Sequence, residues 1–190
     1  MKKQIYIIEH LESRVWRWCI IEYKHISKIV GKNHLWFTNI KRGSKELEKY
    51  GKVFRNSVSK MNLHNACVLD PEAKAFLTPK NSSPISYFIF GGILGDHPPK
   101  KRTKIELTSK LNNPKAFNIG KKQFSTDNAV FVVHEIASGK NFSDSKFKDG
   151  IEVSLNNIET VDFPFRYVIA NGKPLISSEL ITYLKRKQNL

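Results

Sequence analysis

The stretch Tyr87–Lys100, YFIFGGILGDHPPK, begins as an apolar strand and continues as a glycine-rich loop. Three glycines fall within five residues, and an acid, an imidazole and two prolines follow them. Glycine lets the backbone approach a ligand closely and adopt positive φ, so this composition favours a functional loop over an ordinary turn. The spacing differs from that of a GxGxxG dinucleotide loop, and no Gly-Lys-Ser/Thr follows as in a phosphate loop. We therefore expect a rigid turn that presents Asp96 and His97.

A second loop, Asn118–Asn128 (NIGKKQFSTDN), leads into the start of a helix. Gly120 and Gln123 precede the helix, and Gln123 with nearby backbone amides is suited to reading the edge of an adenine. Ser125 and the two residues after it carry oxygens that can instead cap the helix.

A third loop, Leu69-Asp70-Pro71, follows a short apolar run. Asp70 has two interpretations that the sequence leaves open. It can cap a helix that begins at Pro71, or it can face the same site as the other loops, because it too follows a strand.

Apolar strand patterns alternate with helical ones along the chain. Strands are expected at Gln4–Leu11, Leu35–Ile40, Ala66–Leu69 and Tyr87–Ile89, and helices at Glu12–Val30, Ser44–Gly51, Ser125–Ala137 and Ser177–Arg186. Asn171-Gly172 predicts a hairpin turn between Arg166–Ala170 and Lys173–Ile176. This alternation predicts an α/β fold with a mostly parallel sheet flanked by helices. In such sheets ligands bind beyond the carboxyl ends of the strands, where these loops lie.

The length of 190 residues predicts a single domain over residues 1–190. Lys and Arg total 32 against 17 acids, a net charge of +15 that attracts polyanions. The expected partner is RNA or a protein beside RNA; a generally basic surface is the alternative, because the lysines are spread along the whole chain. The N-terminal apolar run is too short for a signal peptide or a membrane span, so a cytoplasmic protein without membrane contact is expected.

The two cysteines, Cys19 and Cys67, lie in apolar surroundings. This pattern predicts buried free thiols in a reducing compartment. Neither cysteine has a second ligand at close spacing, and His134-Glu135 lacks the further histidine of a zinc helix. No metal site is expected.

The glycine-rich loop and the loop after it resemble those of the SPOUT-class methyltransferases. The resemblance rests on FGGILGDHPP (90–99) and IGKKQFSTDNAV (119–130). IYIIEHLE (5–12), VLDPEA (68–73) and FPFRYVIANGKP (163–174) extend it, in the expected order, over almost the whole chain. More narrowly, the chain is similar to the archaeal and eukaryotic group that includes a yeast arginine methyltransferase of a small-subunit ribosomal protein.

The resemblance implies a C-terminal trefoil knot, an exception to the rule that chains do not thread loops. It implies S-adenosyl-L-methionine (SAM) as cofactor, bent in the knot and held mainly by backbone groups. The implied cofactor residues are Gly91, Gly92, Leu94, Gly95, Asp96, Ile119, Gly120, Gln123 and Ser125. Lys100-Lys101-Arg102 stands where the group often has Arg-Gly-Arg, so a stiffer loop end is expected. On this basis Gly92→Val should abolish cofactor binding and leave the fold intact.

The resemblance also implies methylation of an arginine in a ribosomal protein or ribosomal subunit, by an enzyme that acts as a monomer rather than a homodimer. A guanidinium is always protonated, so its nitrogen needs carboxylates around it and a proton acceptor. Candidates at strand ends are the acids Glu9, Asp70 and Asp96, with His10 and His97 as acceptors. In the alternative interpretation, Glu9 caps the first helix and His97 only braces Asp96.

Two further functions remain open from the sequence. An RNA methyltransferase would place basic and aromatic residues around the methyl donor to hold phosphates and stack a base, and RNA contact through the basic surface fits the charge. A non-catalytic RNA-binding module with the same fold is the other. The intact glycine loop argues against that module, because only a cofactor requires such close backbone approach.

Overall fold

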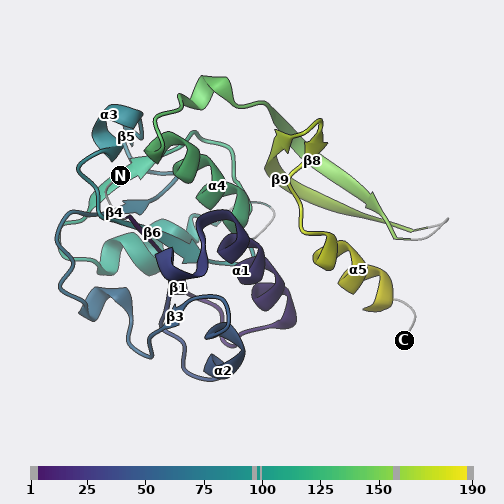
Figure 1. The fold of residues 1–190 in the computed structure, drawn as a ribbon, viewed down its shortest axis with the longest axis horizontal. Helices are drawn as coiled ribbons and strands as arrows, with labels where there is room; N and C mark the ends of the chain where they lie inside the picture. Colours follow the sequence, from purple (N-terminus) through teal and green to yellow (C-terminus); the bar gives the residue numbers. More distant parts are fainter. Residues whose placement is uncertain (1–3, 96–97, 99, 156–158, 188–190) are drawn as a thin grey trace.

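The computed structural model describes residues 4–95, 98, 100–155 and 159–187, and seven strands in them form one sheet (Figure 1). Across the sheet the strands are β3 (Lys52–Val53), β2 (Leu35–Thr38), β1 (Ile5–His10), β6 (Tyr87–Gly92), β4 (Ala66–Leu69), β7 (Lys115–Asn118) and β5 (Ala75–Phe76). Every pairing between neighbours is parallel. The predicted α/β fold is confirmed. The passage of the chain through a trefoil knot stays a prediction.

The central strands are apolar runs, as expected for a parallel sheet that is covered on both faces. All six residues of β1 are buried. Side chains alternate between the two faces of a strand, so Tyr6 and Ile8 enter one apolar cluster and Ile5 and Ile7 enter another. This alternation decides below which strand-end residues reach the candidate site.

The two faces of the sheet are covered differently. One carries the long helices α1 (Arg17–Val30) and α4 (Thr126–Ala137), which pack against each other. The other carries short turns, chiefly η2 (Val58–Lys60) and the π-helical turn η3 (Thr103–Leu107). The remaining short elements are η1 (Lys32–His34), α2 (Ser44–Leu47), α3 (Pro79–Ser82), η4 (Thr108–Lys110) and η5 (Phe142–Asp144).

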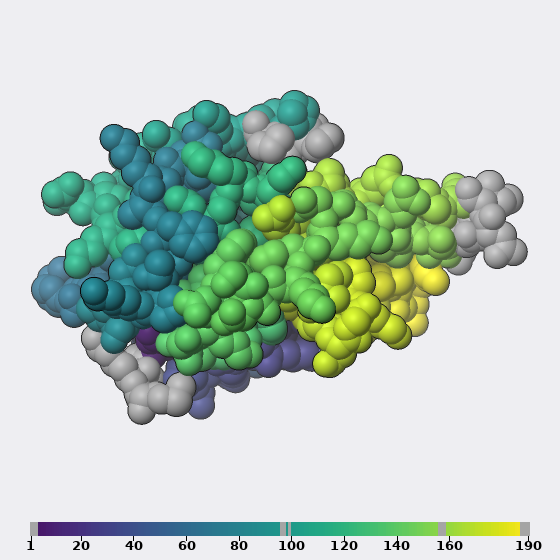
Figure 2. Space-filling view, turned by 90° about the horizontal axis from the view of Figure 1, so that it is seen from above, coloured from purple at the N-terminus to yellow at the C-terminus, as the bar shows by residue number. Residues whose placement is uncertain are grey.

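The C-terminal arm, residues 147–187, extends from one side of the sheet domain (Figures 1 and 2). It consists of the antiparallel strands β8 (Phe147–Ser154), β9 (Thr160–Ala170) and β10 (Lys173–Pro174), followed by α5 (Ser178–Lys187). Asn171 and Gly172 both have positive φ, as a two-residue hairpin turn requires, so the predicted hairpin is confirmed. The arm joins the body where Val168 N–H donates to Asn128 Oδ1 at 2.8 Å.

The first helix begins later than predicted, at Arg17 instead of Glu12. Glu12 is used elsewhere, since its carboxylate accepts the Leu94 N–H at 3.1 Å. No side chain caps α1, whose N-cap is Trp16, so the interpretation of Glu9 as a cap of this helix was wrong. Strands β3, β5 and β7 were missed because two to four residues carry too short a pattern to recognise.

Both cysteines are free and buried, as predicted. Burial raises the pKa of the Cys19 thiol to about 12, so it is no nucleophile at neutral pH. Among the described residues no helix has the length and apolar character needed to cross a membrane.

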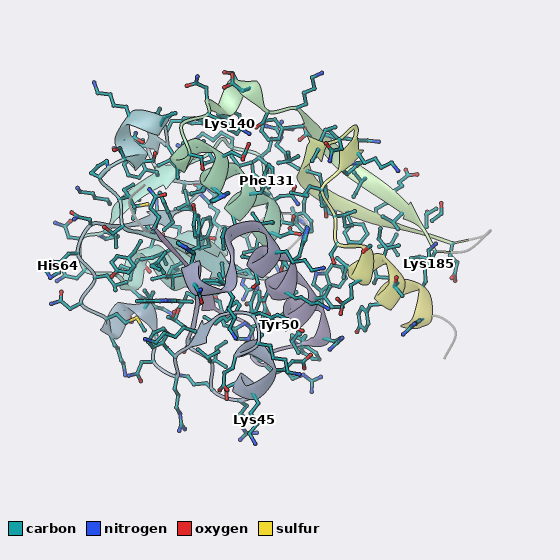
Figure 3. All side chains as sticks on the ribbon, viewed as in Figure 1. Lys45, Tyr50, His64, Phe131, Lys140 and Lys185 are labelled. Atoms are coloured by element: carbon teal, nitrogen blue, oxygen red, sulfur yellow. The ribbon has the colours of Figure 1, made fainter. Side chains whose placement is uncertain are left out.

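The positive charge is distributed around the molecule. Lys45 in α2, Lys140 after α4 and Lys185 in α5 lie on separate sides of the ribbon (Figure 3). These three lysines do not share one surface, so the charge that matters for function has to be sought near the candidate site.

Candidate active site

A cavity opens where β4, β6 and β7 end. The loops that follow these three strands form its walls, because the carboxyl ends of parallel strands meet at one edge of a sheet. The C-terminal arm closes another side with Phe165 and Tyr167 of β9 and Leu180 of α5. The cavity therefore lies at the junction between the sheet domain and the arm.

Seven of the nine predicted cofactor residues line this cavity. They are Gly91, Leu94, Gly95, Ile119, Gly120, Gln123 and Ser125. They come from two loops about 25 residues apart in the sequence, so the structure brings together what the sequence resemblance grouped. The two others, Gly92 and Asp96, are treated separately below.

Bare backbone forms part of the cavity wall. A Cβ at Gly95 would lie 2.7 Å from Phe165 Cζ and 3.0 Å from Gln123 Nε2, and Gly95 has a φ of 77°. A Cβ at Gly91 would lie 3.1 Å from Ile93 Cδ1. Side chains at these positions would fill the space beside the loop, so glycine keeps it open.

The cavity also has the composition that a nucleoside needs. Leu69, Phe90, Phe117 and Ile119 supply apolar surface, and Gln123 adds an amide that can donate and accept hydrogen bonds. An apolar slot with a few polar groups and close backbone is the usual form of such a site. The residues present therefore fit the SAM cofactor that the resemblance implies.

Gly92 does not line the cavity. It lies on the helix-covered face of β6, where an added Cβ would overlap the Tyr23 hydroxyl and come 2.9 Å from Ile8 Cγ2. The reason for glycine here is packing of α1 against the sheet. The expectation that Gly92 contacts the cofactor is not supported by this placement.

Glu9 also lies apart from the cavity. Its side chain shares the face of β1 that carries Ile5 and Ile7, and its Oε2 accepts the Thr38 hydroxyl at 2.5 Å and the Val58 N–H at 2.9 Å. These bonds fix η2 against the sheet. The structure thus gives this predicted catalytic acid a structural position.

His10 faces the α1 side of the sheet and is buried. Its Nδ1 hydrogen-bonds the Tyr23 hydroxyl at 2.8 Å, and burial lowers its pKa. Its Nε2 has no hydrogen-bond partner among the described residues. His10 does not line the cavity, which separates it from a proton-accepting role there.

Asp70 does line the cavity, as one of its two interpretations predicted. The other interpretation was wrong, because a turn and not a helix follows Pro71. Oδ1 of Asp70 accepts the Glu72 N–H at 2.9 Å, and Oδ2 accepts the Thr108 hydroxyl at 2.7 Å. Both oxygens therefore hold the turn and η4 in place.

Asp96 and His97 lie outside the described residues, so their predicted roles stay predictions. The loop on either side of them is anchored. Arg102 bonds Glu12 Oε1 at 2.8 Å and Glu106 Oε1 at 2.7 Å, and these carboxylates raise its pKa. The same Glu12 oxygen receives the Leu94 N–H, so one carboxylate ties together both ends of the glycine-rich loop.

Lys101 stands where the Arg-Gly-Arg pattern has glycine, and its backbone conformation reflects this. Lys101 has a φ of 54°, a left-handed conformation that glycine adopts without strain and lysine does not. Its ammonium group forms an exposed ion pair with Glu72 at 2.9 Å. The backbone thus keeps the shape that glycine would favour in the Arg-Gly-Arg pattern.

Sequence reasoning missed a buried carboxyl in the cavity wall, Glu22 of α1. Its Oε1 accepts the Thr126 N–H at 3.1 Å and so caps α4 from another helix. Burial first, and then Asp127, raise the pKa of Glu22 to about 8. The available signal was its position between Cys19 and Ile26, which puts an acid on the apolar stripe of α1.

Around Ser125 the capping interpretation is replaced by a polar network. The Ser125 hydroxyl donates to Asp127 Oδ1 at 2.6 Å, and Asp127 Oδ2 lies 2.7 Å from His25 Nδ1. Ser125 occupies the N-cap position of α4 without a side-chain cap bond, because Glu22 supplies the cap.

Comparison with known structures places this fold in the SPOUT class of methyltransferases. The crystal structure of Trm10 from Thermococcus kodakaraensis is similar with a TM-score of 0.56 and 18% identity, over 74% of this chain and 96% of that one, which is a likeness of fold. The chain belongs to the family of SFM1-like protein arginine N-methyltransferases, which matches residues 5–190. The prediction of a methyltransferase is thereby confirmed.

Relatives in this family extend over nearly all of the chain. Protein arginine N-methyltransferase SFM1 of Saccharomyces cerevisiae is 32% identical over 95% of this chain and 94% of its own length. The crystal structure of the yeast arginine methyltransferase SFM1 complexed with SAM has a TM-score of 0.87 and 32% identity, over 100% of this chain and 93% of that one. The complex with SAH has a TM-score of 0.85 and 33% identity, with 95% and 94% covered.

Proposed function

We propose that this chain transfers a methyl group from SAM to an arginine side chain of a small-subunit ribosomal protein. One observation carries the proposal: the two loops that the sequence resemblance pairs meet in a cavity whose wall is partly bare backbone. Membership of the arginine N-methyltransferase family and a buried carboxyl in the same wall support a guanidinium as the acceptor.

In this proposal the cofactor is held by the loops after β6 and β7. Gly91, Leu94 and Gly95 would provide backbone contacts, and Gln123 would bond the adenine edge beside Ile119. When bound, SAM supplies an electrophilic methyl group on a sulfonium. The chain contributes by orientation and by excluding water, which together can supply most of the rate of an in-line displacement.

Charge at the mouth of the cavity supports a substrate that lies near RNA. Lys100, Lys121 and Lys122 are exposed and line the opening, while the acids Glu22, Asp70 and Asp127 lie deeper and are buried. Carboxyls inside suit a guanidinium, and lysines outside suit phosphates around it. A ribosomal protein inside a small subunit presents both.

The test is incubation of the purified protein with labelled SAM and purified small ribosomal subunits, followed by separation of protein from RNA. Label in one ribosomal protein, recovered as methylarginine after hydrolysis, is the expected result. Label only in RNA would overturn the arginine assignment in favour of an RNA methyltransferase. An absence of label, combined with no calorimetric binding of SAM, would indicate a non-catalytic module.

A further inference from the structure

Glu22 lies on the face of α1 that looks into the cavity. Trp18, one turn earlier on the same helix, also lines it, and so do Ser125, the N-cap residue of α4, and Tyr167 of β9. Glu22 is buried, with 8% of its surface exposed, as are the cavity acids Asp70 and Asp127. Helix α1, the start of α4 and strand β9 therefore meet around one carboxyl.

Two backbone N–H groups at the start of α4, those of Thr126 and Asp127, favour the charged form of this carboxyl. The Thr126 N–H donates to Oε1 at 3.1 Å, and no hydrogen bond of 3.5 Å or less joins Oε2 to a described residue. In the described part of the chain, His10 Nε2 is the one side-chain N or O atom that is both fully buried and without a hydrogen-bond partner. Oε2 of Glu22 has no partner and is not such an atom, so it is not fully buried. Because Glu22 lines the cavity, we take Oε2 to be open to the cavity, where a ligand can bond it.

Other carboxyls of the cavity are already bonded by the protein. Both oxygens of Asp70 hold neighbouring loops. Asp127 bonds Ser125, His25 and the Asn128 N–H. Glu22 is thus the acid that combines deep burial with an oxygen directed to the ligand space.

The surroundings disfavour a negative charge on Glu22 until a cation arrives. Burial is the main cause, and Asp127 of α4 also repels that charge. The hydroxyl of Tyr167, the thiol of Cys19 and the phenol of Tyr23 are neutral groups near it. A buried carboxyl of this kind exchanges its proton near neutral pH, which suits general base catalysis. Binding of a guanidinium would supply the missing positive charge.

We propose that Glu22 Oε2 binds the guanidinium of the substrate arginine and accepts the proton that this nitrogen loses during methyl transfer. This inference rests on the proposed arginine methylation. A C–N bond forms to the arginine nitrogen as the C–S bond of the donor breaks, and sulfur keeps the electron pair as a neutral thioether. The methylated nitrogen passes one proton to Glu22, so the product guanidinium keeps a single positive charge, and Glu22 releases the proton to water.

The test uses Glu22→Gln, which keeps Oε1 to accept the Thr126 N–H and removes the charge. Glu135→Gln is the matched control, because Glu135 lies on α4 and pairs with Lys140 at the surface. Calorimetry with SAH should give the same affinity within about twofold for all three proteins. Single-turnover methyl transfer to small ribosomal subunits should fall by at least about 100-fold in Glu22→Gln and remain unchanged in the control.

A second measurement reads the carboxyl itself, by NMR of protein with ¹³C-labelled glutamate side chains and bound SAH. One carboxyl should titrate near neutral pH, disappear in Glu22→Gln, and shift to lower pH when Nα-acetyl-L-arginine methylamide is added. The citrulline analogue, which is uncharged, should leave that titration unchanged. This NMR measurement tests the role of Glu22 even if the wild-type protein labels no ribosomal protein. A lack of labelling would refute the proposed substrate and not the role of Glu22.

Three results would overturn the inference. Transfer by Glu22→Gln within about threefold of wild type would show that Glu22 only caps α4. A loss of SAH affinity in Glu22→Gln as large as its loss of methyl transfer would show that Glu22 supports the cofactor loops. A carboxyl titration that ignores the arginine probe would show that the guanidinium binds elsewhere.

Discussion

At Gly92 the backbone of β6 passes against the Tyr23 hydroxyl and Ile8, with no room for a side chain. We expect Gly92→Val to destabilise the protein by about 2 to 3 kcal/mol, because a branched side chain in a filled core forces its neighbours apart. Chemical denaturation monitored by circular dichroism would measure this. From the sequence we expected Gly92→Val to leave the fold intact and to abolish cofactor binding. Unchanged stability of the variant would support that expectation.

Lys101 gives a prediction of the opposite sign, since its φ of 54° strains a lysine. Lys101→Gly should raise Tm by roughly 1 to 3 °C, because relief of backbone strain exceeds the loss of an exposed ion pair with Glu72. Lys101→Ala removes the same ion pair but keeps the strain, and it should give no rise. Equal Tm values for the two variants would show that φ is not the cause.

Glu22 makes stability depend on pH. Its pKa is about 8 in the folded protein against 4.5 for an ordinary glutamate, so the folded state holds a proton that the unfolded state releases. Stability from this group is therefore fully present below about pH 4.5 and is lost as pH rises through 8, by at most about 5 kcal/mol. Denaturation of wild type and Glu22→Gln across this range should show the curves separating as pH rises, with the variant more stable at pH 8. Parallel curves would refute the raised pKa.

At the scale of elements, the sequence predicted the long and strongly patterned parts well. The central strands β1, β4 and β6 and the helix α4 appear where their apolar patterns placed them. The short strands β3, β5 and β7 were missed because they depend on pairing partners that are distant in sequence. Strand β8 was also missed, and of β9 only Arg166–Ala170 was predicted. The same limit applied to the site: Glu9 lies near the end of β1 and Asp70 follows β4, but only the observed structure shows which of them turns toward the cavity.

The contact between the glycine-rich loop and β9 gives an element-scale prediction. Gly95→Ala should reduce SAM affinity by at least about tenfold, because the added Cβ would lie 2.7 Å from Phe165 Cζ and separate the arm from the loop. Removing the ring in Gly95→Ala/Phe165→Ala should recover part of the affinity, giving a non-additive cycle by calorimetry. Additive losses would mean that the backbone conformation of Gly95, with its φ of 77°, is the cause.

For the molecule as a whole, residue patterns alone predicted an α/β protein with loops at strand ends, and the resemblance supplied the methyltransferase class. Neither could reveal the arm as a wall of the cavity, because Phe165 and Leu180 are far in sequence from the loops that they cover. Glu22 escaped notice for a related reason. A single acid in an apolar helix pattern acquires chemical meaning only when another helix and a strand are packed around it.

The net charge of +15 gives a prediction for the whole molecule. If Lys100, Lys121 and Lys122 at the cavity mouth contact rRNA phosphates beside the substrate arginine, each contact releases a counterion. Three such contacts imply that KM for small ribosomal subunits rises about 20-fold between 50 and 200 mM salt. The affinity for SAM should change little, since its site is lined mainly by backbone and apolar groups.

Lys121→Gln/Lys122→Gln should flatten the salt dependence of KM while leaving SAM affinity intact, measured by methyl transfer at several salt concentrations and by calorimetry. A salt dependence as steep in this variant as in wild type would place the RNA contact on another face of the molecule.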